Sequence, residues 1–171
     1  NNIVVSTVMS NYGFKQAIEK FNFDLIETPV GDKYVAEAMK KYDAALGGEQ
    51  SGHIIISDLL PVGDGLVTLI YVLKAMQHFG VALSDFKREH LYEYPQKLTN
   101  LELKNKLNDE ELEYINQIAL DMSIKKDLDG RYLIRNSGTE PLLRVLVEAK
   151  SNEAMEDFSN ELITKINKYL N

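Results

Sequence analysis

Cysteine is missing from this 171-residue sequence, and positive charge is in short supply. Without cysteine, the chain can form no disulfide and offers no thiolate for a metal ion or for nucleophilic attack. The 19 Lys and Arg residues are outnumbered by 26 Asp and Glu residues, which gives a net charge of −7. Nucleic acids and anionic membranes call for a clustered basic face, so neither is expected as a partner, and an anionic ligand must be bound by local charges.

Long hydrophobic runs are also lacking. The longest, residues 66–76, is interrupted by Thr68 and Lys74, and it falls short of the roughly 20 residues that span a bilayer. Hydrophobic residues make up 44% of the chain, which is ordinary for a globular protein with a real core. A cytoplasmic location is expected, and the absence of cysteine is compatible with that reducing compartment. The sequence opens on Asn1 rather than on methionine, so we expect a piece of a longer polypeptide.

Residues 1–90 alternate between strand-like and helix-like segments, which is typical of an α/β domain with crossover helices. We predict a small mixed sheet in an α/β/α arrangement. Residues 66–79 are apolar at nearly every position and are predicted to form a helix buried on most sides, the core of this domain. Asp32 and Asp64 each precede a helical pattern and are predicted to cap it. The expected strands are residues 3–8, 23–28, 44–46 and 53–57, and the first helix is residues 13–21.

A run of tyrosine, proline and polar residues between positions 90 and 100 marks a domain boundary. We place it so that residues 91–171 form the second domain. Their pattern is strand, helix, strand, strand, helix, and a capping box at Asn108 and Glu111 begins the first helix. The prediction is a small α+β domain whose two helices cover one face of an antiparallel sheet.

Residues 135–141, which read Arg-Asn-Ser-Gly-Thr-Glu-Pro, are expected to be a polar loop between two strands. The guanidinium of Arg135 can donate to two phosphate oxygens at once, and the hydroxyls of Ser137 and Thr139 can donate further hydrogen bonds. Gly138 would let backbone N–H groups turn toward the anion. The alternative is a hairpin loop in which these residues serve turn geometry alone.

Two features near this loop have more than one interpretation. Arg144, on the following strand, belongs to the same polar stretch but could instead be a structural partner of Glu140 or Glu148. Asp127 and Asp129 faintly suggest an acidic metal loop, but aspartate followed by glycine before a strand is ordinary turn chemistry. No metal site is therefore predicted in this chain.

A second polar loop, residues 47–53, reads Gly-Gly-Glu-Gln-Ser-Gly-His between two short predicted strands. Glu49 can accept hydrogen bonds from sugar hydroxyls and Ser51 can donate to them, while His53 could carry a proton there. The alternative is a polar turn, with His53 satisfied by the backbone. Lys33 lies at a helix N-terminus, where the dipole disfavours a cation, so it is either a ligand of a bound anion or a solvent-facing lysine.

Both loops resemble motifs of the α-D-phosphohexomutases. Residues 135–141 resemble the phosphate-binding loop of that family, and residues 48–53 resemble its sugar-recognition loop, with Gln50 as in the phosphoglucosamine mutase branch. Residues 7–11 and 30–35 match further segments in the same order. The resemblance identifies the two predicted domains with the third and fourth domains of a four-domain enzyme, that is, with its C-terminal half.

The sequence departs from the family pattern at two places. The arginine usual in the second of those segments is replaced by Lys33, which keeps the charge but cannot donate in the same paired geometry. The threonines that usually precede Asp64 are replaced by Pro61 and Val62. A ligand role for the loop around Asp64 is therefore not expected.

The resemblance implies a phosphotransferase-type isomerase that interconverts glucosamine 6-phosphate and glucosamine 1-phosphate through a bisphosphate, for UDP-N-acetylglucosamine and cell-wall synthesis. Glu49 and Ser51 take positions that read sugar hydroxyls, and His53 lies near the transferred phosphoryl group. Arg135, together with the loop residues Ser137, Gly138 and Thr139, takes the position that binds the phosphate of a hexosamine phosphate substrate. Lys33 is a further expected substrate ligand.

The phosphoserine motif of the family, Ser-His-Asn-Pro, and its metal motif, Asp-Gly-Asp, do not occur in this sequence. The resemblance therefore implies that the phosphoryl carrier and Mg²⁺ belong to domains one and two of the same polypeptide, with glucosamine or glucose 1,6-bisphosphate as activator. Alone, the chain is expected to be inactive. The alternatives are a phosphoglucomutase or phosphomannomutase fragment and a non-enzymatic sugar-phosphate-binding module.

Overall fold

The structure is a computed structural model that describes residues 2–170. The chain divides into two compact units, Asn1–Glu93 and Tyr94–Asn171, here called unit 1 and unit 2. The division falls within the tyrosine- and proline-containing stretch, shortly after residue 90. Each unit is described by itself.

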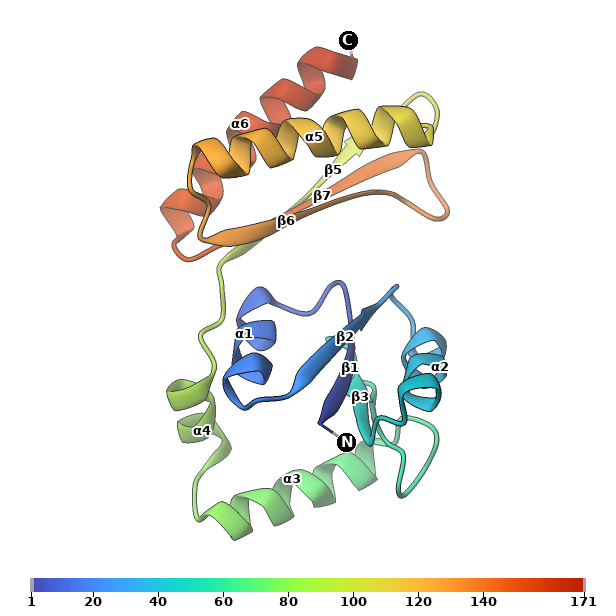
Figure 1. Ribbon diagram of the computed structural model, residues 1–171, viewed down its shortest axis with the longest axis vertical. Coiled ribbons are helices and arrows are strands. Elements are labelled where there is room, and N and C mark those ends of the chain that lie inside the picture. Colours follow the sequence, from blue (N-terminus) through green and yellow to red (C-terminus); the bar gives the residue numbers. More distant parts are fainter. Residues whose placement is uncertain (1, 171) are drawn as a thin grey trace. The chain divides into compact units, whose positions relative to one another are not determined.

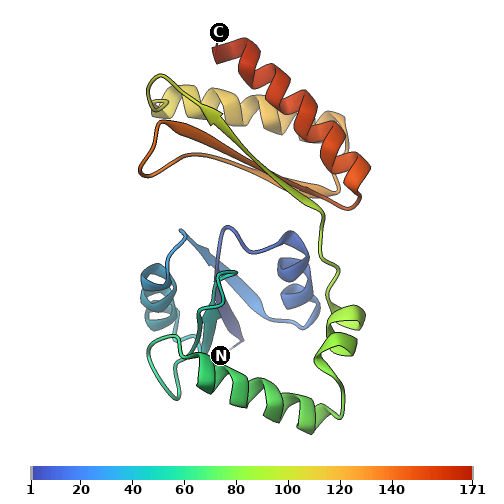
Figure 2. The same ribbon diagram turned by 180° about the vertical axis from the view of Figure 1, so that it is seen from behind.

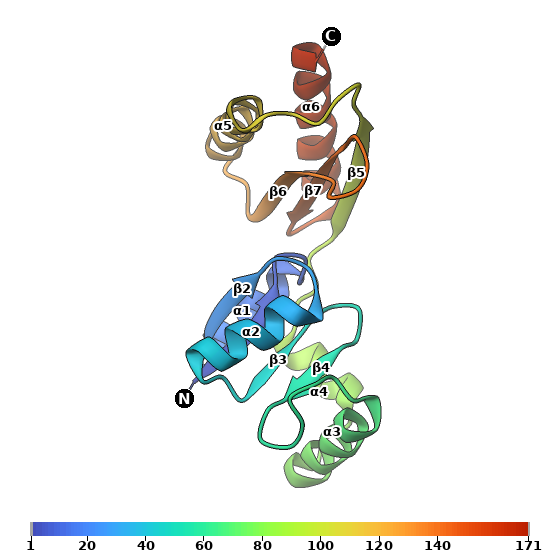
Figure 3. The same ribbon diagram turned by 90° about the vertical axis from the view of Figure 1, so that its right-hand side faces the viewer.

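Unit 1 contains a four-stranded mixed sheet in the order β2-β1-β3-β4. Strand β1 pairs in parallel with β2 and β3, whereas β4 pairs antiparallel with β3, beside which it is labelled in Figure 3. This confirms the predicted α/β class and the mixed sheet. The strands are β1 (Ile3–Thr7), β2 (Asp24–Thr28), β3 (Leu46–Gly48) and β4 (Ile54–Ile56), and the helices are α1 (Tyr12–Lys20), α2 (Asp32–Tyr42), α3 (Gly65–Phe79) and α4 (Leu83–His90).

The core of unit 1 is a small cluster between the sheet and α2. Val35 and Met39 of α2 are buried against Val5 and Ile55 of the sheet, together with Ala44. Figure 1 shows the strands β1, β2 and β3 between α1 and α2. The short strands hold the polar loop of residues 49–53 at the end of the sheet.

Helix α3 differs from the prediction. It forms over the expected residues, but none of its residues is buried, and Leu66 and Leu73 are 73% and 53% exposed. The prediction of a buried core helix was wrong. The apolar sequence of α3 indicates that the helix needs packing partners, but within its unit α3 contacts only β4 extensively. Among residues 2–170, no single helix has the length and hydrophobicity to cross a membrane; α3 and α4 together have both, but the pair is bent by 77°.

The two predicted caps of unit 1 had different outcomes. Asp64 caps α3, because its carboxylate accepts hydrogen bonds from the backbone N–H groups of Leu66 and Val67, both at 2.9 Å. Asp32 does not cap α2, because the helix begins one residue earlier than predicted. The N-cap is Gly31, which has a φ of 134°. Asp32 is therefore the first helical residue, where a negative charge still suits the dipole.

Unit 2 is an antiparallel three-stranded sheet in the order β5-β7-β6, covered by two helices. Both helices lie on the same side of the strands in Figure 2, and Figure 3 shows α5 in end view beside α6. The predicted α+β arrangement is thereby confirmed, as is the capping box of Asn108 and Glu111 at the start of α5. The elements are β5 (Gln96–Glu102), α5 (Asp109–Lys125), β6 (Gly130–Asn136), β7 (Leu142–Ala149) and α6 (Asn152–Leu170).

The two faces of the unit 2 sheet have different chemistry. Alternate residues of β7, such as Val145 and Val147, are fully buried in the core with Phe158 of α6. The residues between them point to the opposite face, because side chains alternate along a strand. There the fully buried Glu148 accepts a hydrogen bond from Nε of Arg131. The charged side chains of Arg131, Arg135, Arg144 and Glu148 therefore lie on the face away from the helices, together with Leu133 and Leu146.

Candidate functional site

The first candidate site is the loop that joins β3 to β4. It is closed at its base by a hydrogen bond from Glu49 N to the carbonyl oxygen of His53, at 3.0 Å, and Gly52 N donates to Glu49 O at the same distance. Gly52 has a φ of 95°, in the region that side-chain-bearing residues rarely adopt. The loop conformation therefore depends on glycine at this position.

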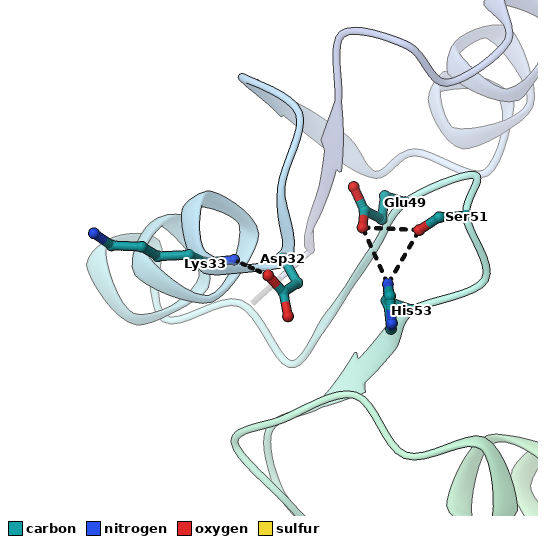
Figure 4. Close-up of polar contacts among 5 residues, drawn as sticks. All are labelled: Asp32, Lys33, Glu49, Ser51 and His53. Atoms are coloured by element: carbon teal, nitrogen blue, oxygen red, sulfur yellow. Dashed lines mark hydrogen bonds and ion pairs between the residues drawn. The ribbon is translucent and has the colours of Figure 1, made fainter. Parts of the chain in front are cut away.

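Three side chains of this loop form a triangle of hydrogen bonds (Figure 4). Ser51 Oγ donates to Glu49 Oε1 at 2.8 Å, His53 Nδ1 lies 3.1 Å from Ser51 Oγ, and the same nitrogen lies 3.2 Å from Glu49 Oε1. The Glu49 side chain is only 9% exposed, whereas that of His53 is 59% exposed. The sequence therefore brings a largely covered carboxylate, a hydroxyl and an imidazole together at one surface point.

The triangle stabilises the ionised form of Glu49. The hydrogen bond from Ser51 lowers the pKa of the Glu49 carboxyl below its usual value, burial opposes this, and His53 and the backbone at Gly31 lower it further. An ionised carboxylate accepts hydrogen bonds and donates none. Glu49 is thus suited to accept from the hydroxyl groups of a polyol ligand.

Lys33 is not part of the triangle. Its side chain points away from Glu49, Ser51 and His53 in Figure 4, while its backbone N–H donates to Asp32 at 2.8 Å. Its ammonium is 3.8 Å from Glu37 Oε1, in a pair that is largely exposed. The ligand role of Lys33 stays a prediction.

A pocket of ≈ 310 Å³ adjoins the triangle. Glu49 and Gln50 line one side of it, and Val4, Leu46 and Ile54 of the sheet line much of the remainder. Ser51 and His53 do not line it. Its largely apolar wall offers few partners for a sugar phosphate, so the exposed triangle is the better candidate for polar recognition.

The second candidate site is the hairpin between β6 and β7. The sequence predicted a loop from residue 135, but Arg135 and Asn136 belong to β6 and are paired with Arg144 and Leu143 of β7. The strand continues because cross-strand pairing overrides the polar character of these two residues. The connecting residues are therefore 137–141 only.

Ser137 shapes this hairpin. It is 2% exposed, its N–H donates to Leu142 O at 2.7 Å, and its hydroxyl oxygen accepts from Glu140 N at 3.4 Å. Thr139 and Gly138 are exposed. Gly138 does not have a positive φ, and a Cβ added there would meet nothing within 4 Å. The backbone of Gly138 is thus not left-handed, and there is open space beside it.

Two arginines lie opposite each other at the base of the hairpin. Arg135 of β6 is paired with Arg144 of β7, and Arg144 is paired with Asn100 of β5 on its other side. Directly opposed residues of antiparallel strands point to the same face. The three side chains therefore form a polar row across the face away from the helices, and the two like charges of Arg135 and Arg144 are cross-strand neighbours in it.

This row has the features of an anion site. Burial, and secondarily the charge of Arg144, lowers the pKa of Arg135. Arg144 Nε is buried without a hydrogen-bond partner among the described residues, and its Nη2 is 4.0 Å from Glu140. A bound anion would relieve both the repulsion and the missing hydrogen bond. Of the two pairings left open by the sequence, the one with Glu140 is present as a long ion pair, whereas Glu148 pairs with Arg131.

Sequence patterns pointed to Arg135 but left Arg144 undecided. The signal that could have assigned it is the hairpin register, which places the two residues side by side once the strand is extended to residue 136. Metal binding has no support within the described residues, where no group of three or more His, Asp or Glu side chains is placed to hold an ion.

The chain matches two family models along nearly its whole length. Residues 1–94 match phosphoglucomutase/phosphomannomutase, alpha/beta/alpha domain III, and residues 98–165 match phosphoglucomutase/phosphomannomutase, C-terminal domain. The chain therefore belongs to the phosphoglucomutase/phosphomannomutase family, which confirms the resemblance carried by the two loops.

Curated relatives in this family are named phosphoglucosamine mutase. The protein of Bacillus subtilis (strain 168) is 42% identical over 160 residues, which is 94% of this chain and 36% of that protein. The protein of Streptococcus agalactiae serotype Ia is 46% identical over 157 residues, which is 91% of this chain and 35% of that protein. The chain thus spans about a third of the length of these relatives.

Solved structures share the fold at low sequence identity. An Aspergillus fumigatus N-acetylphosphoglucosamine mutase aligns with a TM-score of 0.82 and 19% identity, covering 99% of this chain and 39% of that one. A variant of the same enzyme in complex with glucose 1,6-bisphosphate aligns with a TM-score of 0.77 and 21% identity, covering the same shares. At this identity, the likeness establishes the fold of the two units.

Proposed function

We propose that this chain is the substrate-binding C-terminal portion of a phosphoglucosamine mutase, which interconverts glucosamine 6-phosphate and glucosamine 1-phosphate through a bisphosphate intermediate. The observation that carries the proposal is the opposed pair Arg135 and Arg144 beside the hairpin hydroxyls. Two guanidinium groups provide a divalent phosphate with charge and with paired hydrogen bonds. Relatives at 42% and 46% identity with the same name support it.

Unit 1 contributes sugar recognition in this proposal. The ionised Glu49 accepts from sugar hydroxyls, and Ser51, now donating to Glu49, can accept from a hydroxyl as well. His53 adds a further polar group on the exposed side of the triangle. Lys33 would reach the ligand only after a change of side-chain conformation, because it points away in this structure (Figure 4).

Unit 2 contributes phosphate binding. Arg135 and Arg144 bind the non-reacting phosphate, and Thr139, Ser137 and the backbone at Gly138 supply further donors. Binding energy from a remote phosphate can align the reacting end of a substrate. The units of this chain therefore position the sugar phosphate, while the phosphoryl group is transferred elsewhere.

The remaining chemistry is assigned to domains one and two of a longer cytoplasmic polypeptide. They would supply a phosphoserine and bind Mg²⁺, with glucosamine or glucose 1,6-bisphosphate as activator. In this proposal the chain alone has no mutase activity, and the product serves UDP-N-acetylglucosamine and cell-wall synthesis.

The proposal is tested by steady-state kinetics on the longer polypeptide that contains this chain. Arg135→Ala and Arg144→Ala should each raise the KM for glucosamine 6-phosphate by about tenfold or more, because each removes a charge-assisted hydrogen bond worth about 1.5–3 kcal/mol. Arg88→Ala is the control, since it removes the same charge from an exposed position in unit 1. An unchanged KM in both test variants would rule out the phosphate role.

A substrate comparison separates the rival activities. The same polypeptide is assayed with glucosamine, glucose and mannose 6-phosphates, and the highest kcat/KM is expected for glucosamine 6-phosphate. A preference for glucose or mannose phosphate would make it a phosphoglucomutase or a phosphomannomutase. Turnover by the 171-residue chain alone would contradict the division of labour proposed above.

A further inference from the structure

The hairpin proposed to bind phosphate is hydrogen-bonded to the segment between β5 and α5. We call residues 103–107 the brace. At one end of the brace, Leu103 N donates to Pro141 O at 2.9 Å. At the other end, the carboxamide of Asn136 both donates to Leu107 O, at 2.8 Å, and accepts from Leu107 N, at 3.3 Å. Both sides of the hairpin are therefore tied to the brace.

The brace also reaches the exposed turn of the hairpin. The ammonium of Lys106 donates to Gly138 O at 2.6 Å. A hydrogen bond from a charged donor is stronger than one between neutral groups. This is a contact between residues 32 positions apart, and no motif in the sequence indicated it.

The contact fixes the direction of one peptide group. In a trans peptide, the C=O and the following N–H point in opposite directions, and the structure contains no cis peptide bond among its described residues. Because Gly138 O points toward Lys106, the N–H of Thr139 points away from it. Without the ammonium, this exposed peptide could turn over and present its carbonyl oxygen, which repels a phosphate.

The brace is itself well anchored. It begins where β5 ends, and the residue after it, Asn108, forms the capping box of α5. Asn108 Oδ1 accepts from Glu111 N at 2.9 Å, and Glu111 Oε2 accepts from Asn108 N at 2.8 Å. Lys106 therefore extends from a segment fixed at both ends.

We infer that Lys106 is a positioning residue for phosphate binding: it holds the Gly138–Thr139 peptide with its N–H available to the anion. The inference rests on the proposed function of the hairpin. It assigns a role to a residue outside the loop motif, and the role is exerted through the peptide orientation rather than through contact with the reacting atoms.

The test compares Lys106→Met with Lys104→Met in the 171-residue chain. Both variants remove one positive charge from an exposed position of the brace, but Lys104 makes no hydrogen bond or ion pair with the described residues. The dissociation constant of inorganic phosphate should rise about tenfold in Lys106→Met, the expected effect of losing one charge-assisted hydrogen bond. It should change less than about twofold in Lys104→Met, and Lys106→Arg should restore most of the affinity.

A second readout separates peptide orientation from general destabilisation. In Lys106→Met, the amide ¹⁵N and ¹H shifts of Thr139 should change, and hydrogen exchange of the β7 amides should not. Normal phosphate affinity in Lys106→Met would overturn the inference alone, provided that Arg135→Ala weakens binding by about tenfold or more. If Arg135→Ala binds phosphate normally, or if the unaltered chain binds none, the proposed function and the inference are both overturned.

Discussion

The two units are stabilised differently. Among the described residues, unit 2 has a contiguous core of 12 buried residues from both helices and the sheet, whereas the core of unit 1 has five. Unit 1 also has a 15-residue apolar helix, α3, without a buried residue. Because buried apolar area is the main favourable term in folding, unit 2 should be the more stable of the two.

The difference also bears on the two candidate sites. In unit 2, the Arg135 and Arg144 pair lies on a sheet whose other face is fully packed. The stability contributed by that core offsets the repulsion between the two charges. In unit 1, the Glu49 triangle lies on a five-residue loop between three-residue strands. We therefore expect the unit 1 site to depend more on local backbone geometry, and the unit 2 site more on charge.

The largest expected effect is on the core of unit 2. Phe158→Ala should destabilise unit 2 by about 3–5 kcal/mol, because it removes a large buried side chain and leaves a cavity. Hydrogen exchange measured residue by residue should quicken for β7 and stay unchanged for β1. Equal acceleration in both sheets would show that the units unfold as one.

The matched control is Leu69→Ala in α3, where the side chain is 52% exposed. Its effect should stay within about 0.5 kcal/mol, as for other surface positions. A loss comparable to that of Phe158→Ala would mean that α3 is covered in solution.

Replacing a glycine by alanine should have different effects on stability in the two loops. Gly52→Ala should destabilise unit 1 by about 1–2 kcal/mol, because Gly52 has a φ of 95° that a Cβ disfavours. Gly138→Ala in unit 2 should be neutral or stabilising by up to about 1 kcal/mol, since its φ is not positive and a Cβ has open space. Thermal or denaturant unfolding followed by loop-specific NMR signals measures both. Equal costs would contradict the assigned backbone conformations.

The smallest effect concerns two carboxylates. Glu49 in unit 1 has its pKa lowered chiefly by the Ser51 hydroxyl, whereas Glu161 in unit 2 has its pKa lowered chiefly by Lys126. A lowered folded pKa contributes stability above the usual value of 4.5, and this contribution is lost as the pH falls through the folded pKa. Ser51→Ala should therefore raise the Glu49 pKa toward 4.5.

Salt distinguishes these two carboxylates. At 1 M salt, where the screening length is about 3 Å, the Glu161 pKa should rise and the Glu49 pKa should change less. Carboxyl ¹³C titration reports both values. A Glu49 pKa that follows salt as closely as that of Glu161 would assign its shift to His53 rather than to Ser51.

Local patterns sufficed for much of the fold. The capping box at Asn108, the cap at Asp64 and the helix–strand alternation each depend on neighbouring residues, and the sequence showed them. The burial of α3 could not be predicted, because hydrophobicity specifies a need for partners but not their presence. The continuation of β6 through Arg135 depends on pairing with Arg144, a non-local contact.

The same distinction between local and non-local contacts applies to the candidate sites. Glu49, Ser51 and His53 lie within five residues, so the loop motif brought them into one prediction, and the structure places them in contact. Arg144 required the strand register. Lys106 lies 32 residues from its partner, and no spacing rule connects the two.

We propose that unit 2 binds phosphate at the β6–β7 hairpin while unit 1 recognises the sugar. This proposal is tested most directly by adding inorganic phosphate to the ¹⁵N-labelled chain and mapping amide shifts. We expect saturable shifts at Ser137, Gly138 and Thr139 and none at Glu49 or Ser51. Shifts confined to the Glu49 loop, or none at the hairpin, would contradict it.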